Sequence, residues 1–358
     1  MKKRIAGINV ARALAVIGMI IVNFKIVLGK TGNNCLKAFI QIFDGKAAAT
    51  FVVLAGVGLA LMTNSVIKSQ NRQKLKTAQK RIIKRALFLF IVGLSYIKIW
   101  PADILHFYGI YMMATLPFIN KKPKQALIGA LALIFIYPLL LLFWNYETGW
   151  NFIILEYKDF WTLEGFLRNL FYNGFHPVIP WTAFMLVGLW FGKQNMTNKK
   201  FIKKTLIISA SALIIVQFIS YLSIRIISKI SGETIESLTE ILGTSPMPPM
   251  PIYMLNGIFA ALTIISASIL ISEQFQNSKI INALNKTGQL ALTFYVAHVI
   301  IGIGIVEAIN PAKLGKYSIE FSASYAIIFS LLCVLFAIVW LRYKKTGPLE
   351  LIMRKITD

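Results

Sequence analysis

The sequence is poor in cysteine, in histidine and in acidic residues, and each shortage narrows what the protein can be. Two cysteines, Cys35 and Cys333, stand far apart among 358 residues, one in a polar stretch and the other in an apolar run. They exclude a disulfide framework and a cysteine-based metal site, so no metal is implied. Only 14 acidic residues stand against 38 lysines and arginines. The resulting net charge of +24 has to be explained by where the basic residues lie.

The chain is also too apolar for a soluble globular protein. Hydrophobic residues make up 57% of it, charged residues only 15%, and the mean hydropathy is +0.67. These values indicate an integral membrane protein. The N-terminal apolar run is interrupted by Arg12, and no small-residue cleavage site follows it. We therefore interpret it as a retained first helix rather than a removed signal sequence.

Ten apolar runs are long enough, or nearly long enough, to cross about 30 Å of hydrocarbon. The pattern predicts an all-α, polytopic bundle of about ten transmembrane helices, forming a single membrane domain over residues 1–358 of a multi-pass cell-membrane protein. The third, fourth and sixth runs are short and interrupted. The runs are Ile8–Leu28, Ala47–Asn64, Ala86–Trp100, Ile104–Ile119, Ala126–Trp144, Val178–Phe191, Leu206–Ile227, Ile252–Ile271, Leu290–Ile309 and Ser322–Leu341.

The basic residues fall mostly on one side of this pattern. With the N-terminus in the cytoplasm, the segments on that side hold most of the lysines and arginines and few of the acids, which predicts cytoplasmic N- and C-termini. The basic residues are then topology determinants and contacts for anionic lipids, not a nucleic-acid surface. These segments are the head with Lys2, Lys3 and Arg4, the loops 68–85, 121–124, 193–204 and 279–286, and the tail 342–358.

Two longer segments are predicted on the outer side. In the first, residues 145–176, apolar residues at helical spacing from Trp161 to Tyr172 predict a helix lying along the outer leaflet. In the second, residues 228–251, four prolines near the end exclude a helix there. Small residues in the second run, among them Gly56 and Gly58, predict close packing between helices.

Polar residues inside the first run mark a functional face. Arg12 and Asn23 are eleven residues apart, close to three helical turns, and Asn9 precedes Arg12 on nearly the same stripe. Polar groups are costly in hydrocarbon, so this face is predicted to look into protein or water. The alternative for Arg12 is a snorkelling topology residue. Asp44 opens the second run from the outer side.

The three histidines are the candidate catalytic groups. His106 follows Asp103 by three residues, so that the carboxylate can orient the imidazole on one helical face. His176 lies between Gly174 and two prolines at the outer entrance of the sixth run, and His298 lies near the middle of the ninth. The structural alternatives are an interfacial ion pair for His106, a helix cap for His176 and a buried hydrogen bond for His298.

Several blocks of sequence resemble known membrane families. The strings 4-RIAGINVARALAVIGMIIVNF-24, 43-FDGKAAATFVVLAGVGLAL-61 and 174-GFHPVIPWTAFMLVGLWFGK-193 resemble the heparan-alpha-glucosaminide N-acetyltransferase catalytic family. The strings 288-GQLALTFYVAHVII-301 and 347-GPLELIMRKIT-357 resemble the bacterial family DUF418. The first resemblance covers residues 1–192 and the second residues 201–358.

The resemblance implies transfer of an acyl group from cytosolic acetyl-CoA or another acyl-CoA to an amino or hydroxyl group of a sugar on the far side. The family's arginine, asparagine and acid match Arg12, Asn23 and Asp44. The sequence departs from the family at Asn9, where an acid is usual, and at Ala13, where glycine is usual. The loop 25–41 also lacks the acyl-transfer histidine that the glucosaminide enzymes carry there.

The sequence therefore predicts a membrane-bound acyltransferase in which another histidine acts. His176 or His106 is the predicted base, Asp103 orients His106, Asn23 stabilises the oxyanion, and Asp44 belongs to the same site. Arg12 and His298 are predicted on the donor side, where the Arg12 guanidinium attracts coenzyme A phosphates. The expected partners are membrane lipids, acyl-CoA, an extracytoplasmic glycan or lipid-linked acceptor, and a second copy in a homodimer. The alternative function is a transporter or flippase for a small or lipid-linked substrate.

Overall fold

The computed structural model describes residues 5–357, so the predicted basic head of Lys2, Lys3 and Arg4 lies outside the described residues. The described chain is almost entirely helical, as predicted. The first half contains α1 (Ala6–Leu28), α2 (Asn34–Gln41), α3 (Lys46–Lys68), α4 (Arg72–Ser95), α5 (Leu105–Thr115), η1 (Leu116–Phe118), α6 (Pro123–Leu141), β1 (Trp150–Asn151), β2 (Glu156–Tyr157), α7 (Leu163–Arg168), η2 (Asn169–Asn173) and α8 (Val178–Gly192).

The second half begins with a helix of 33 residues, of which only Ile202, Ser209 and Ser220 are buried. It contains α9 (Lys199–Ser231), α10 (Ile235–Leu242), α11 (Pro251–Gln274), α12 (Lys279–Gln289), α13 (Ala291–Ala297), η3 (His298–Ile303), α14 (Gly304–Ile309), η4 (Pro311–Lys313), α15 (Ile319–Tyr343) and α16 (Pro348–Thr357). Both η2 and η3 are π-helical turns.

The described residues contain seven helices long and apolar enough to span a membrane, or eight if the bent pair Leu163–Asn173 and Val178–Gly192 forms one span. This number is lower than the predicted ten. The third predicted span belongs to α4, whose first half is strongly basic, and the fourth belongs to α5, which has only eleven residues. The sixth is the second arm of the bent pair, which turns by 46°.

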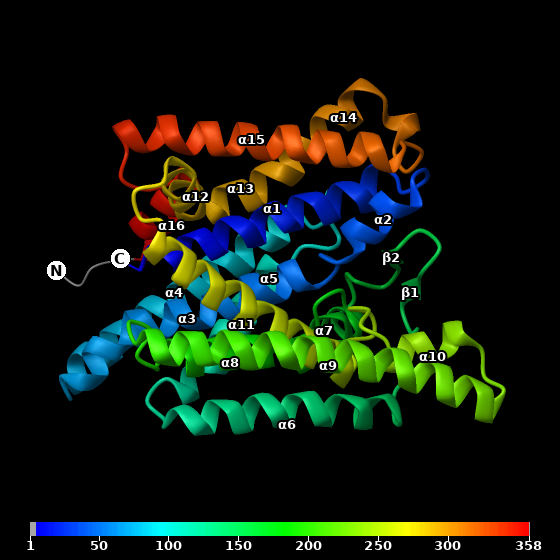
Figure 1. Cartoon of the computed structure of the whole chain (residues 1–358), viewed down its shortest axis with the longest axis horizontal. Coiled ribbons are helices and arrows are strands. Elements are labelled where there is room, and N and C mark those ends of the chain that lie inside the picture. The colour runs from blue at the N-terminus through cyan, green and yellow to red at the C-terminus, as the bar shows by residue number, and fades with distance from the viewer. Residues whose placement is uncertain (1–4, 358) are drawn as a thin grey trace.

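The long helices lie side by side in one bundle, from α15 at the top of Figure 1 to α6 at the bottom. Helix α1 lies inside it and packs on α3, α11, α12 and α15. Its small side chains Ala11, Ala13 and Ala15 are buried, which allows neighbouring helices to approach closely. The start of α1 and the whole of α16 lie at the same end of the bundle (Figure 1). That end is the predicted cytoplasmic side.

The predicted close packing of the second run holds for Gly56 but not for Gly58. Helix α3 crosses α8 so closely that a Cβ atom on Gly56 would collide with the backbone of Met185, and one on Gly188 would collide with the Val53 carbonyl. At Gly58 a Cβ atom would meet only the Arg12 guanidinium, at 3.5 Å. Gly56 and Gly188 therefore form the tight crossing, while Gly58 leaves space beside Arg12.

We expect Gly188→Ala to destabilise the protein by ~1–3 kcal/mol, because the added methyl group forces α3 and α8 apart. The measurement is thermal unfolding in detergent, followed by tryptophan fluorescence. Gly304→Ala is the matched control, since a Cβ atom at Gly304 meets nothing within 4 Å. Equal melting temperatures for the two variants would show that the α3–α8 crossing tolerates a wider spacing.

The segment 145–176, predicted to lie on the outer side, contains more structure than one interfacial helix. Strands β1 and β2 form a short antiparallel hairpin whose apolar tip includes Ile153, 94% exposed. The expected helix is present as α7 and η2, and together with α8 it forms the bent pair described above. Its residues Asn169 and Leu170 are buried. In the other predicted outer segment the stretch 243–250 is non-helical as predicted, whereas Pro251 is the first residue of α11, and α10 precedes this stretch.

Candidate functional site

A buried carboxylate, that of Asp103, is the centre of a polar network inside the bundle. Asp103 is 0% exposed and His106 is 1% exposed. The Asp103 Oδ2 atom lies 2.9 Å from His106 Nδ1 and accepts a hydrogen bond of 3.0 Å from the His106 backbone N–H. Tyr96 donates its hydroxyl proton to Oδ1, and Tyr295 donates to the same atom at 3.3 Å. Each carboxylate oxygen therefore has defined partners.

The local sequence explains this placement. Helix α4 ends at Ser95, and the chain turns through residues 96–104 before α5 begins at Leu105. Asp103 stands just before α5 and accepts from the backbone N–H three residues on, as a capping side chain does at a helix N-terminus. The same three-residue spacing places the His106 ring within hydrogen-bond distance of the Asp103 carboxylate. The contact between Asp103 and His106 that the sequence suggested is thus present, and it combines a cap with an oriented imidazole.

A second histidine joins the network from the other half of the chain. His298 Nε2 lies 2.9 Å from the side-chain nitrogen of Asn23, near the end of α1. The rings of His298 and Tyr295 have centroids 5.3 Å apart, and Tyr295 reaches Asp103 through its hydroxyl. The Tyr295 hydroxyl also accepts the backbone N–H of Ile104 at 3.0 Å. Asn23, which is partly exposed, is thereby joined to one cluster with the buried residues His298 and Asp103.

The third histidine lies on the other side of Phe107. The Phe107 ring is 3.9 Å from the His106 ring and 6.0 Å from the His176 ring, measured between centroids. His176 packs edge-on against Trp181 at 4.6 Å, and its carbonyl oxygen accepts a hydrogen bond from Tyr111. The three histidines thus come from α5, the turn before α8 and η3 to one region of the bundle interior.

Each histidine has at least one buried ring nitrogen without a hydrogen-bond partner among residues 5–357. These buried atoms are His106 Nε2, His176 Nδ1 and His298 Nδ1. Buried polar atoms in proteins are nearly always paired, so each of the three is available to a reacting molecule or to a proton. Among them only His106 has its other nitrogen directly on a carboxylate, the arrangement that favours proton acceptance at the free nitrogen.

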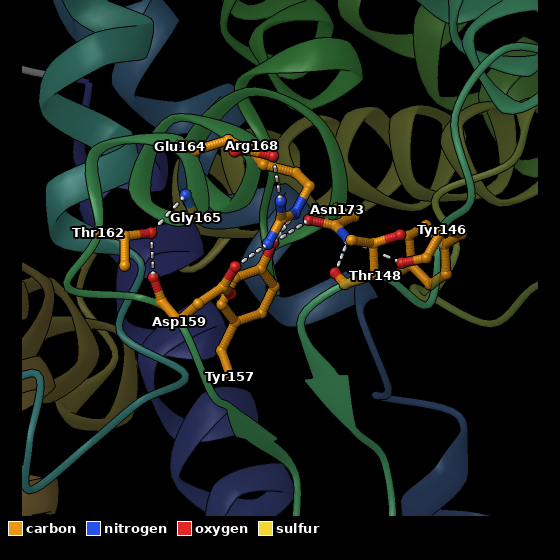
Figure 2. A network of polar contacts seen from close by, with 9 residues as sticks. All are labelled: Tyr146, Thr148, Tyr157, Asp159, Thr162, Glu164, Gly165, Arg168 and Asn173. Atoms are coloured by element: carbon orange, nitrogen blue, oxygen red, sulfur yellow. Dashed lines mark hydrogen bonds and ion pairs between the residues drawn. The ribbon is translucent and has the colours of Figure 1, made fainter.

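Hydrogen bonds from the hairpin segment hold the end of η2, just before the turn that carries His176 (Figure 2). The Asn173 side chain donates to the carbonyl oxygens of Tyr146 and Thr148 and accepts from the Tyr157 hydroxyl at 2.7 Å. Arg168 donates to the Tyr157 hydroxyl and pairs with Asp159. These contacts therefore connect the hairpin to the π-helical turn η2, which ends three residues before His176.

Two adjoining cavities open on the other side of the network. We call the larger one, about 1000 Å³, the outer cavity because it lies nearer the basic end of the bundle, on the predicted cytoplasmic side. It is lined by six cationic side chains and a single carboxylate, Glu350. The inner one, about 340 Å³, is mostly apolar and extends to Leu105, Tyr108 and Phe51. Arg12, Gln289, Glu350 and Arg354 line both. The cations of the outer cavity are Arg12, Lys68, Lys121, Lys193, Lys345 and Arg354.

The inner cavity ends one side chain short of the network. The Phe51 ring lines the cavity and stacks on Tyr295, with centroids 6.0 Å apart. Leu105 also lines it and directly precedes His106. Arg12 stands where the two cavities meet and donates to the Asn9 side chain at 3.0 Å. The cavities thus lead from the basic end of the bundle to within one side chain of the Asp103 network.

Asp44 lies apart from this network in the structure. Both of its carboxylate oxygens accept from the Lys25 ammonium group at 2.6 Å, and the Lys25 side chain is only 8% exposed. The pair ties the end of α1 to the turn before α3. Among residues 5–357, no hydrogen bond or ion pair joins Asp44 to the histidines. Its predicted place in the catalytic site stays a prediction, and the contact that the structure shows supports α1.

Sequence reasoning missed Tyr96, Tyr295 and Glu350. The available signal for Tyr295 was a tyrosine three residues before His298, within an apolar run. Glu350 was one of few acids in a basic segment, which is itself a signal of a specific partner. Within the described chain, no group of three or more metal-ligating side chains is present.

Two known protein families match most of the chain. The family described as Heparan-alpha-glucosaminide N-acetyltransferase, catalytic, matches residues 4–228. The family described as Protein of unknown function (DUF418) matches residues 189–358. No curated protein and no solved structure matches the chain. The first match covers more than half of the sequence and includes Arg12, Asn23, Asp103, His106 and His176.

Proposed function

Because the chain belongs to the heparan-alpha-glucosaminide N-acetyltransferase catalytic family, we propose that it is a membrane acyltransferase. Its donor is cytosolic acetyl-CoA or a related acyl-CoA. Its acceptor is an amino or hydroxyl group of a glycan or lipid-linked molecule at the outer face. The observation that carries this proposal is the pair of cavities that leads from a cationic mouth to the buried network of Asp103 and His106.

The shape and charge of the cavities suit a coenzyme A thioester. The phosphates of coenzyme A would bind among the cations of the outer cavity, and charge-assisted hydrogen bonds from Arg12 and Arg354 would be the strongest of these contacts. The apolar inner cavity would hold the pantetheine arm. The thioester would then lie beside Phe51 and Tyr108, next to the polar network.

The proposed base is His106, with Asp103 as its orienting group. His106 Nε2 removes the proton of the acceptor hydroxyl or amine as its oxygen or nitrogen attacks the thioester carbonyl carbon. The carbon–sulfur bond then breaks, and the leaving sulfur receives the proton from His106, which gives coenzyme A and the acylated acceptor. The proposed role of the Asn23 amide, which contacts His298, is to stabilise the developing oxyanion.

The test uses the open space at Gly58, which lines the inner cavity. We expect acetyl-CoA to raise the melting temperature of the wild-type protein in detergent. Gly58→Leu fills the cavity beside Arg12, and we expect it to weaken acetyl-CoA binding by at least about tenfold while the protein still folds. Gly58→Ala is the control and should bind nearly as wild type.

Two results would argue against the proposed donor site. One is the absence of any protection of the wild-type protein by acetyl-CoA. The other is equal protection of the wild-type protein and Gly58→Leu, which would place the donor outside the inner cavity.

A further inference from the structure

Glu350 is the only carboxylate among the described residues that line either cavity. It lies on α16, the last helix, which packs against α4 and α13 at the end of the bundle where α1 begins (Figure 1). Burial raises the pKa of Glu350 above the usual carboxyl range, and hydrogen bonds from Thr293 offset part of that rise. A carboxylate among cations that would bind phosphates works against donor binding, so its presence needs another explanation.

The contacts of Glu350 supply that explanation. Its Oε1 atom accepts from the backbone N–H groups of Leu292 at 2.9 Å and Thr293 at 3.2 Å, and its Oε2 atom accepts from the Thr293 hydroxyl at 2.6 Å. The Thr293 hydroxyl in turn accepts the backbone N–H of Leu349 at 3.1 Å. We call these four hydrogen bonds the Glu350 clasp.

The clasp replaces a missing local cap. The chain leaves the helical conformation at Leu290, between α12 and α13, with φ −109° and ψ 23°. The first amides of α13 therefore lack partners within their own helix, and α13 has no side-chain cap of its own. A carboxylate there satisfies two of these amides and interacts favourably with the helix dipole. Glu350 provides it from 57 or 58 residues further along the chain.

The helix that is held in this way carries part of the polar network. Tyr295 is two residues after Thr293, and His298 is five residues after it. Tyr295 contacts both Asp103 and the backbone of Ile104, and His298 contacts Asn23. A shift or rotation at the start of α13 would therefore move both side chains relative to Asp103.

We propose that Glu350 is a positioning residue of the transferase: from the wall of the donor cavity it fixes the start of α13, so that Tyr295 and His298 stay aligned with Asp103. This inference rests on the proposed function for its catalytic consequence. Its structural part, the fixing of α13, stands on the clasp alone. In this proposal Glu350 acts through α13 and not on the donor.

Replacing Glu350 should separate catalysis from donor binding. We expect Glu350→Ala to lower kcat about tenfold through misalignment of the network. Donor affinity should stay within about threefold of wild type, or become tighter, because a repelling charge leaves the cavity. Glu350→Gln keeps one oxygen for the two amides and should restore most of kcat. Thr293→Val removes the hydroxyl and should give an intermediate loss.

A second readout does not depend on activity. We expect faster amide hydrogen exchange in the segment 291–298 of Glu350→Ala, measured by mass spectrometry in detergent micelles. The control is Glu273→Ala, which removes a glutamate paired with Lys199 at 2.9 Å at a half-exposed position. That control should leave both exchange and kinetics unchanged.

The outcomes distinguish the two proposals. Unchanged exchange in Glu350→Ala overturns the positioning role, whatever the activity. A loss of donor affinity with kcat unchanged also overturns it, because Glu350 would then act on the donor. If Glu350→Ala does not fold, Glu350→Gln and Thr293→Val give the same readouts. A wild-type protein without transferase activity but with exchange controlled by Glu350 contradicts only the proposed function.

Discussion

Replacement of His106 by alanine is expected to lower kcat for acetyl transfer by about 10³-fold, with acetyl-CoA affinity nearly unchanged. The physical reason is that His106 alone among the three histidines has one ring nitrogen on a buried carboxylate and the other unpaired. General base catalysis contributes about 10²–10⁴-fold, and its loss should appear in kcat. The measurement is acyl transfer in proteoliposomes, with donor binding followed separately by thermal shift.

Two companion variants define the base more closely. Asp103→Asn should keep the His106 contact but weaken proton acceptance, and so lower kcat less than His106→Ala and change its pH profile. His176→Ala should retain more activity than His106→Ala, because the His176 ring packs on Trp181 with no carboxylate partner. A larger loss in His176→Ala than in His106→Ala would reverse the assignment of the base.

The second large effect is expected at Arg12. Arg12→Ala should raise the KM for acetyl-CoA between about tenfold and a hundredfold, since a charge-assisted hydrogen bond to phosphate is lost where both cavities meet. The effect should shrink as ionic strength increases, because salt screens the wild-type attraction. Steady-state kinetics at two salt concentrations measure both quantities.

The comparison for Arg12 is a lysine on the same predicted side. Lys80→Ala removes one positive charge from the exposed face of α4, outside both cavities, and should change the KM by less than about twofold. Arg12→Lys keeps the charge but loses the planar fork, and so should recover part of the affinity. Equal effects of Arg12→Ala and Lys80→Ala would mean that only the overall charge attracts the donor.

The sequence was sufficient for features that depend on local spacing. Helix α1 runs from Ala6 to Leu28, close to the predicted Ile8–Leu28. Asp103 and His106 are in contact because three residues separate them at a helix start. Arg12 lines both cavities inside the bundle, as expected for a polar residue on a stripe that faces protein or water. Hydropathy and helical periodicity carry this information directly.

Contacts between distant segments could not be read in the same way. Asn23 and His298 are 275 residues apart, and the sequence around either residue does not indicate that it contacts the other. The ion pair between Asp44 and Lys25, nineteen residues before it in the chain, is likewise not visible in the sequence pattern. Because the first half of α4 is basic, the hydropathy pattern does not indicate that it forms one helix with the apolar run that follows. Tertiary pairing decides such cases, and a single sequence records only one side of each pair.

The two π-helical turns have a consequence for how this chain tolerates changes in length. A π turn is equivalent to one residue inserted into an α-helix, and each residue turns the helix by about 100°. η3 begins at His298, and η2 ends three residues before His176. Deleting one residue from either turn would restore regular helix and rotate what lies beyond it. The direction of His176, which follows η2, and the course of α14, which follows η3, are therefore set by residue count as much as by residue identity.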